Sequence, residues 1–242
     1  RCIFKDNNQR LWVATREDGA VRLYDAKSMQ LSGYLGADGR LHQQYTRFGA
    51  VVYCMYQSKD GTLWLGTKPQ GIYRLKETAA GTFHIDHLTQ LPNLNVYNIL
   101  EDRQGRLWVA TLGGGLCYAQ QPQAANPQFV VPKGYPKDAA QRVRYLMVEE
   151  QQQVLLAATT EGLIVSRLEP QADRMIFRLH QREADRTQSL SSSGMMDIIK
   201  AHNGRLYVST ESGGVNLIED ADLLKEQLTF RHYTVQNHML PS

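Results

Sequence analysis

A short motif occurs five times in this chain of 242 residues, and successive copies lie 44 to 52 residues apart. The copy at residues 105–111 is Gly-Arg-Leu-Trp-Val-Ala-Thr, and Leu-Gly-Gly-Gly-Leu follows it at 112–116. Every copy has a leucine directly before its central residue and a threonine three residues after it. The central residues are Trp12, Trp64, Trp108, Leu156 and Tyr207, and the threonines are Thr15, Thr67, Thr111, Thr159 and Thr210. An internal repeat of this period constrains the fold more than any other feature of the sequence.

The motif predicts two short strands joined by a tight loop. Leu107-Trp108-Val109 is too short for a helix and rich in residues that favour strands. The polar residues and glycine before it, 102–105, suit a tight turn, and the glycines after it permit a close loop. Further strand-like segments give each repeat four strands. Four short strands recurring every ~45–50 residues predict an all-β protein, a β-propeller with five four-stranded blades.

The predicted blades cover residues 1–48, 49–90, 91–136, 137–186 and 187–236. In the first blade, residues 25–40 are expected to form an insertion before a fourth strand at 41–46. Four prolines in residues 121–136 of the third blade make its last strand a sheet edge at most. The fourth blade lacks the glycine turn and the aromatic residue, and residues 221–227 of the fifth suit one or two helical turns.

The ends of the chain predict a segment of a longer propeller array. Residues 237–242 resemble the segments that introduce other repeats, and we interpret them as the lead-in to a further blade. The chain also begins at Arg1, without a methionine, inside a predicted first strand. The absence of a targeting segment therefore carries little information.

Charge and apolar content exclude some partners. The 27 basic and 24 acidic residues nearly balance, with no basic run, so we expect no nucleic-acid partner. No apolar stretch approaches the ~18 residues of a membrane helix, so we expect no membrane contact by this segment itself. Cys2, Cys54 and Cys117 form no CxxC pair and are expected to be free, buried thiols.

Residues 102–111, with Gly114-Gly115-Leu116, resemble the two-component regulator propeller repeat, D-x-x-G-x-L-W-[IVL]-[GA]-T-x-x-G-G-[LIV]. Residues 59–67 with 71–75 match nearly as well, and the similarity extends over all five repeats. It weakens in the fourth. The resemblance implies the periplasmic sensor of a hybrid histidine kinase, of a kind common in gut Bacteroidetes, whose parent protein is anchored in the inner membrane. It also implies recognition of an oligosaccharide and signalling to a cytoplasmic kinase, although this chain contains no kinase domain.

The sequence has few signs of catalysis or metal binding. It has no Gly-x-Ser-x-Gly, Walker or HExxH motif. Its seven histidines fall mostly on predicted fourth strands, turns or the tail, which does not suit convergence on one metal. Alternation would put His84 and His87 on opposite faces of a strand. We therefore expect no catalytic residue, metal or cofactor, and assign the three tryptophans and five threonines of the repeat to its structure.

Ligand-binding residues are expected in the loops between second and third strands and at the start of the first strands. In propellers these segments share one end of the central channel, and rigid blades with variable polar loops present binding groups. Tyrosine and arginine side chains stack on sugars and bond to hydroxyls or carboxylates. The candidates are Arg16, Glu17, Tyr53, Lys68, Gln70, Asn95, Tyr97, Arg144, Tyr145, Glu161 and Glu211.

Three functions remain open from the sequence. The first is a sensor segment that binds an oligosaccharide. The second is an interaction scaffold without a small-molecule ligand. The third is a propeller lyase or hydrolase, similar to streptogramin lyases. A lyase or hydrolase of this kind requires acidic residues and a histidine on the first strands. The predicted first strands contain Glu101, Glu149 and Asp197 but no histidine, so this function is the least favoured of the three.

The two end blades are expected to expose apolar faces that favour self-association. We place Ile3 and Trp12 on the face of the first blade, and Ile198 and Tyr207 on that of the fifth. The sequence predicts either a strained ring of five blades or, in preference, an open arc whose end blades meet another copy.

Overall fold

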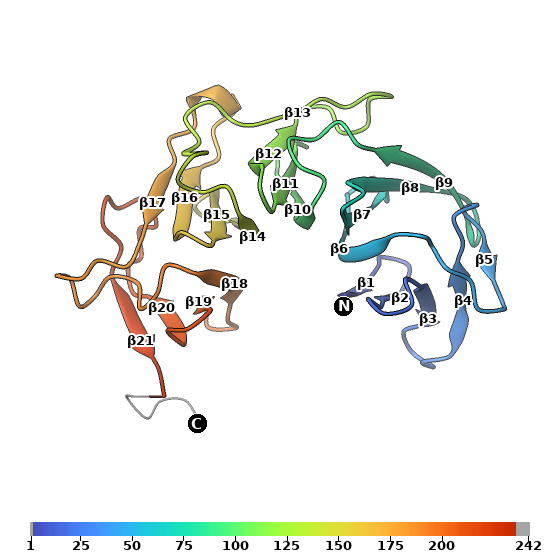
Figure 1. Ribbon diagram of the computed structural model, residues 1–242, viewed down its shortest axis with the longest axis horizontal. Coiled ribbons are helices and arrows are strands. Elements are labelled where there is room, and N and C mark those ends of the chain that lie inside the picture. Colours follow the sequence, from blue (N-terminus) through green and yellow to red (C-terminus); the bar gives the residue numbers. More distant parts are fainter. Residues whose placement is uncertain (1, 236–242) are drawn as a thin grey trace. The chain divides into compact units, whose positions relative to one another are not determined.

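A computed structural model describes residues 2–235, whose strands form five sheets in chain order (Figure 1). The first sheet contains β1 (Cys2–Lys5), β2 (Arg10–Ala14), β3 (Val21–Asp25), β4 (Leu31–Leu35) and β5 (Leu41–His42). The second contains β6 (Val51–Gln57), β7 (Leu63–Lys68), β8 (Ile72–Ala79) and β9 (Thr82–Leu88). The third contains β10 (Val96–Glu101), β11 (Leu107–Thr111), β12 (Gly115–Ala119) and β13 (Phe129–Val130).

The fourth and fifth sheets follow the same order. The fourth contains β14 (Val143–Glu149), β15 (Val154–Thr159), β16 (Leu163–Arg167) and β17 (Arg178–His180), with the short 3-10 helix η1 (Ala172–Arg174) before β17. The fifth contains β18 (Met195–Lys200), β19 (Leu206–Thr210), β20 (Val215–Ile218) and β21 (Phe230–Tyr233). Each repeat thus forms one antiparallel blade, and the prediction of an all-β propeller fold is confirmed.

Two local predictions were wrong. The predicted insertion at 25–40 contains β4, so the first sheet has five strands rather than four. Leu35 anchors β4 because its side chain is completely buried. Residues 221–227 form no helix, since their backbone hydrogen bonds go elsewhere. Gln152 accepts from the Leu223 amide and donates to the Ala221 carbonyl.

The described chain divides into two compact units. The first comprises residues up to 109 together with 119–129, and the second comprises residues 110–118 and those from 130 onward. The first two sheets therefore belong to the first unit, the last two to the second, and the third sheet contributes to both. Each unit is described by itself below.

A carboxylate organises the turn before the second strand in two repeats. Asp102 accepts hydrogen bonds from the Arg106 amide at 3.0 Å and the Arg106 Nε at 2.6 Å. It also accepts one from Trp108 Nε1 at 2.7 Å. Asp6 makes the same three contacts with Arg10 and Trp12. The carboxylate thus closes the turn, pairs with a cation and satisfies the indole nitrogen, as a buried charge requires.

The tryptophans lie in the core. Trp12, Trp64 and Trp108 are all completely buried. Trp12 packs with apolar residues of the second sheet and meets the Phe83 ring edge-on, with centroids 5.5 Å apart. Burial of such large rings supplies much of the free energy that holds neighbouring blades together.

The exposed apolar face of each end sheet differs from the prediction. Ile3 is 69% exposed, whereas Trp12 is buried because Phe4, not Ile3, is its cross-strand partner. In the fifth sheet, Ile198 is buried in a cluster with Leu156, while Ile199 pairs with Tyr207 and is 59% exposed. Strand alternation thus places Trp12 and Ile198 on covered faces, and Ile3 and Ile199 on open ones.

Candidate functional site

The first strands of three blades bulge near their starts. The register between β6 and β7 shifts around Tyr53, and that between β14 and β15 shifts around Arg144. A third shift, between β18 and β19, falls at Met196. A bulge leaves one residue outside the regular ladder and re-aims its side chain, which is why bulges are common beside binding sites.

In the first unit, the bulge creates an aromatic pair. The rings of Tyr53 and Tyr97 lie with centroids 5.1 Å apart and planes inclined by 49°. Lys68, at the end of β7, places its Nζ 5.9 Å from the centroid of the Tyr53 ring. All three side chains are partly buried, so they form a fixed platform with an accessible surface. We call Tyr53, Tyr97 and Lys68 the tyrosine platform.

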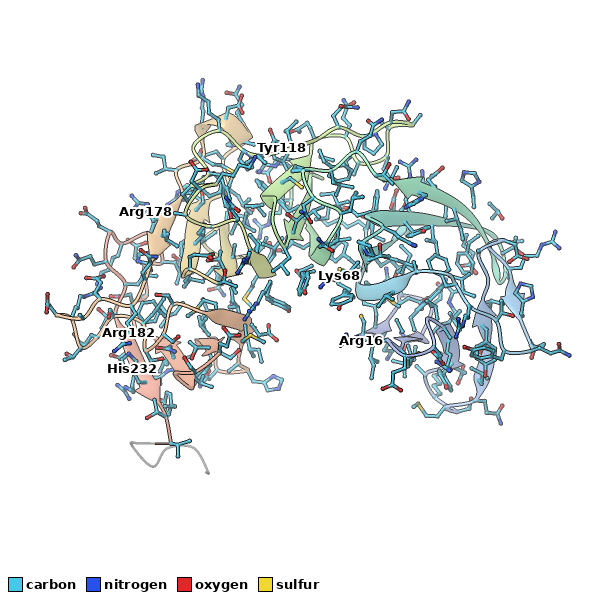
Figure 2. The ribbon with its side chains drawn as sticks, viewed as in Figure 1. Arg16, Lys68, Tyr118, Arg178, Arg182 and His232 are labelled. Atoms are coloured by element: carbon cyan, nitrogen blue, oxygen red, sulfur yellow. The ribbon has the colours of Figure 1, made fainter. Side chains whose placement is uncertain are left out.

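Arg16 and Glu17 lie beside this platform in the same unit. Both are exposed and line an open pocket of about 230 Å³ that also includes Arg47 and Val51. Val51 is the cross-strand partner of Lys68, so the pocket adjoins the platform. Figure 2 shows the side chains of Arg16 and Lys68, which both belong to the first unit. Charges of both signs line the pocket, since Arg16 and Arg47 lie with Glu17 and Asp18, and Asp18 is paired with Arg22.

Two other candidates in the first unit have structural contacts. The Gln70 side-chain oxygen accepts a hydrogen bond from the Tyr73 hydroxyl at 3.0 Å, and its amide nitrogen reaches the Gly49 carbonyl at 3.4 Å. The Asn95 side chain donates to Asn93 at 3.0 Å. Both side chains shape the loops beside the platform.

In the second unit, Arg144 and Glu211 come together. Their charged groups lie 3.4 Å apart, and Arg144 also donates to the Met195 carbonyl at 3.3 Å. Arg144 thus reaches from the first strand of the fourth sheet to that of the fifth. Its guanidinium is partly occupied by these contacts, so it presents fewer free donors than the sequence suggests.

Tyr145 and Glu161 are held by their surroundings. Tyr145 is partly buried against the core of the second unit. Burial raises the pKa of its hydroxyl, and the negative charge of Asp197 raises it further. The Glu161 carboxylate accepts from the Thr160 hydroxyl, and the Glu161 carbonyl accepts from Gln181. The eleven candidates are therefore divided between two units, and the structure brings together Tyr53, Tyr97 and Lys68 in one and Arg144 and Glu211 in the other.

Four of the repeat threonines fasten the loop that follows the second strand. Thr67 and Thr111 each donate from Oγ1 to the carbonyl of Gly71 and Gly115, at 2.8 Å. Thr159 and Thr210 do the same to Gly162 and Gly214. Thr15 differs, because its hydroxyl contacts Asp18 and accepts from Arg22. These short braces hold the candidate loops against the ends of their strands.

Acidic and histidine side chains do not converge in the part of the chain that the structure describes. No group of three or more His, Cys, Asp or Glu residues in it could hold a metal ion. His42 and His84 pair separately with Asp38 and Asp86. Figure 2 shows Arg178 and His232 near the last strands of the fourth and fifth sheets. The described helices include none long and apolar enough to cross a membrane.

Comparison with known families supports the resemblance drawn from the repeat. The family model described as two component regulator propeller matches residues 47–68 and 90–113. These segments contain the tyrosine platform and the motifs around Trp64 and Trp108. A search of curated protein sequences found no match.

Three solved structures illustrate the similarity of the fold. The extracellular domain of the hybrid two-component system BT4673 from B. thetaiotaomicron has a TM-score of 0.64 at 19% identity, covering 92% of this chain and 27% of that one. The corresponding domain of BT3049, from the same organism, has a TM-score of 0.64 at 20% identity, with coverages of 98% and 29%. Virginiamycin B lyase from Staphylococcus aureus has a TM-score of 0.63 at 13% identity, with coverages of 96% and 69%.

The likeness to all three structures concerns the fold alone. The chain spans less than a third of the length of the two sensor domains. It aligns along most of its own length with sensors and with a lyase, so the choice between those functions depends on its own residues.

Proposed function

Since residues 47–68 and 90–113 match the two component regulator propeller model, we propose that the chain is a ligand-sensing segment of a periplasmic sensor in a hybrid histidine kinase. We propose that it binds an oligosaccharide and does no chemistry on it. The parent protein would pass the signal to a cytoplasmic kinase. The lyase function is disfavoured because the acids on the first strands are not joined by histidine, and Glu149 is already held by Lys200 at 2.6 Å.

The tyrosine platform is the observation that carries this proposal. Two partly buried tyrosines 5.1 Å apart offer both ring faces and hydroxyl groups, which suits the apolar face and polar edge of a sugar ring. Lys68, with Arg16 in the adjoining pocket, supplies donors for hydroxyl or acidic substituents. The fixed strands beneath the platform limit the entropy lost on binding.

Calorimetry with a panel of defined oligosaccharides, neutral and acidic, tests the proposal. We expect at least one to bind, and Tyr53→Ala and Tyr97→Ala each to weaken it by about tenfold, or ~1.4 kcal/mol. Tyr24→Ala is the matched control, because Tyr24 lies on β3, is partly buried and belongs to the same unit. This variant should bind as the wild type does.

The alternative is an interaction scaffold without a small-molecule ligand. If no oligosaccharide in the panel bound, or if Tyr24→Ala lost affinity as much as Tyr53→Ala, the platform would not be the site. Exposed Ile3 and Ile199 would then make protein association the better function.

A further inference from the structure

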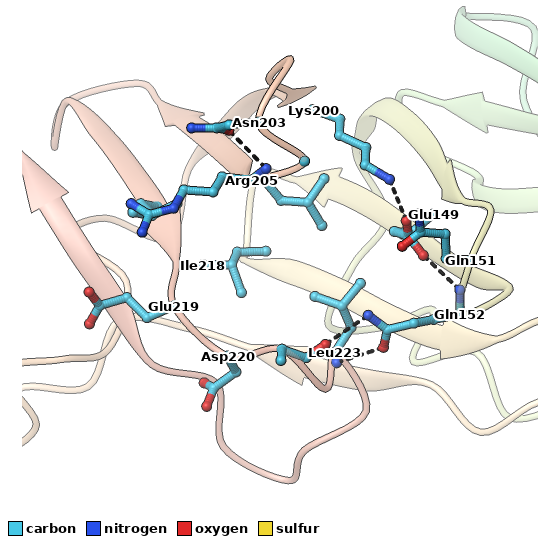
Figure 3. A pocket seen from close by; sticks show the side chains of 14 residues that line it. Glu149, Gln151, Gln152, Lys200, Asn203, Arg205, Ile218, Glu219, Asp220 and Leu223 are labelled. Atoms are coloured by element: carbon cyan, nitrogen blue, oxygen red, sulfur yellow. Dashed lines mark hydrogen bonds and ion pairs between the residues drawn. The ribbon is translucent and has the colours of Figure 1, made fainter.

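A pocket of about 520 Å³ lies in the second unit, at the end of the fourth and fifth sheets opposite to Arg144 (Figure 3). It is bounded by the β14–β15 turn, the β18–β19 turn and the segment after β20. Its apolar lining consists mainly of leucine and isoleucine: Leu206, Leu217, Ile218 and Leu223 are at most 6% exposed. The volume suits a small organic molecule of one or two rings.

One arginine of this pocket lacks the partner that its counterparts have. Arg205 occupies the repeat position of Arg10 and Arg106, directly before the leucine of the motif. Arg10 and Arg106 each pair with an aspartate four residues earlier, Asp6 or Asp102. The equivalent residue in the fifth blade is Ala201.

The turn itself is unchanged by the loss of the carboxylate. The Ala201 amide donates to the Arg205 carbonyl at 2.8 Å, and the Gly204 amide donates to Ala201 at 2.9 Å. The same two bonds close the turn at Asp102. The Arg205 amide, which an aspartate at position 201 would bind, instead donates a hydrogen bond to the Asn203 side-chain oxygen at 3.1 Å. No described carboxylate pairs with the Arg205 guanidinium in place of that aspartate, and the Arg205 side chain is exposed at the pocket.

The acids of the pocket are already paired. Glu149 accepts from Lys200 at 2.6 Å, Asp220 contacts Lys225, and Glu219 contacts Arg231. Arg205 is thus the cation of the pocket that no described carboxylate neutralises. Figure 3 shows Arg205 and Asn203 on one side, and the pair of Lys200 and Glu149 on another.

We propose that this pocket is a second ligand site, and that it takes a small hydroxylated carboxylate such as a sugar acid. The Arg205 guanidinium would bind the carboxylate through two parallel hydrogen bonds. Asn203 and Lys200 donate to hydroxyl groups of the ligand. The site is separate from the tyrosine platform and does not depend on the function proposed for it.

Titration of the intact chain with D-glucuronate, with D-glucose as the uncharged match, tests this site. We expect glucuronate to bind at least tenfold more tightly than glucose. Arg205→Ala should lose this preference. Arg205→Lys should retain part of it, because an ammonium keeps the charge but not the fork of donors.

Ala201→Asp is a more specific test than Arg205→Ala, because it removes no hydrogen-bond donor from the pocket. It restores the carboxylate found at positions 6 and 102, which should pair with Arg205 and block the ligand. We expect this variant to lose glucuronate binding while its melting temperature stays equal to or above that of the wild type. Arg182→Ala, which removes an exposed arginine outside the pocket, should bind glucuronate normally.

Several results would overturn the proposal. They are equal binding of glucose and glucuronate, undiminished binding by folded Arg205→Ala or Ala201→Asp, and no binding of glucuronate at about 10 mM, where even weak affinity is measurable. Loss of binding in Tyr53→Ala alone would place the acid on the tyrosine platform instead.

Discussion

Asp102 and Arg106 form an ion pair whose two side chains are completely buried. A buried charge is costly unless it is paired and hydrogen-bonded, and Asp102 meets this need by also accepting from two backbone amides and the Trp108 indole. One residue thus fixes the turn, the cation and the ring in place. In the second repeat a neutral group, Ser58, accepts from Trp64 Nε1 at 2.8 Å.

Asp102→Ala should therefore cost far more than the matching change in the neighbouring repeat. We expect a loss of about 3–5 kcal/mol in the free energy of unfolding, because the Arg106 charge stays buried without its partner. Ser58→Ala removes one neutral hydrogen bond and should cost about 1 kcal/mol. Urea denaturation of the two variants measures the difference. Equal losses would show that the ion pair has no special role.

Trp108→Ala should lower the free energy of unfolding by about 3–5 kcal/mol, since the completely buried ring leaves a cavity. Thermal melting, with folding at low temperature checked by circular dichroism, measures the effect. A variant that melts like the wild type would mean that the ring is exposed in solution. Sugar stacking on Trp108 would then need to be reconsidered.

We expect the stability of the second unit to depend on pH through His180. Burial, together with the positive charges of Arg186 and Arg178, lowers the pKa of the His180 imidazole to about 4. Since the unfolded chain titrates near ~6.5, it binds the proton first as the pH falls. The contribution of His180 to stability is therefore complete above pH ~6.5 and is lost as the pH falls towards 4.

The His180→Gln variant should lose less stability than the wild type between pH 7 and pH 5. Urea midpoints at the two pH values measure this, and His202→Gln serves as the control because His202 is exposed. If His180→Gln and wild type showed the same pH dependence, another group would be responsible.

At the scale of the element, the threonine brace after the second strand recurs in four of the five repeats. The Thr111 hydroxyl donates to the Gly115 carbonyl and accepts from the Gly114 amide at 3.1 Å, and these three residues are buried. Gly115 has a φ of +74°, and a Cβ there would lie 2.8 Å from the Tyr135 ring. The loop thus needs both the threonine and the glycine, which explains why they recur together.

Thr111→Val keeps the shape of the side chain and removes both hydrogen bonds. We expect a loss of about 1–3 kcal/mol, because a buried carbonyl and a buried amide lose their partner. Thr111→Ser, which keeps the hydroxyl, should cost less. Thermal melting of the Thr111→Val and Thr111→Ser variants measures the two losses. A Thr111→Val variant as stable as Thr111→Ser would contradict the prediction.

The repeat made the blades predictable, because a fixed spacing of leucine and threonine marks the same strand five times, with an aromatic residue between them in four copies. It did not predict β4, since residues 31–35 lie between turn-like segments and carry no repeat signal. The tyrosine platform was accessible to sequence reasoning because Tyr53 and Tyr97 hold the same repeat position. The Arg205 pocket was missed, although the absence of an aspartate at position 201 was visible as a deviation from the repeat.

Other parts of the site depended on contacts that a sequence does not give. The ion pair of Arg144 and Glu211 joins residues 67 positions apart. Similarly, Gln70 and Asn95 are variable loop residues, but the structure shows that their side chains hold neighbouring backbone and side chains. Variability alone does not distinguish a free polar side chain from one that supports a loop.

At the scale of the whole molecule, we expect the exposed apolar residues of the end sheets to favour self-association. Ile3 and Ile199 are 69% and 59% exposed on these faces. We expect the isolated chain to associate with concentration, and Ile3→Lys with Ile199→Lys to reduce this association by placing charges in the apolar contact. Light scattering at several concentrations measures it. A wild-type chain that stayed monomeric at high concentration would contradict the prediction.

The central claim, that the tyrosine platform of the first unit binds an oligosaccharide, is tested most directly by hydrogen exchange. The measurement compares amide exchange with and without an oligosaccharide that binds in calorimetry. We predict that binding slows exchange in peptides from residues 51–57, 63–68 and 96–101, which carry the tyrosine platform. Protection confined to other segments of the chain, or none at a saturating concentration of the ligand, would contradict the account.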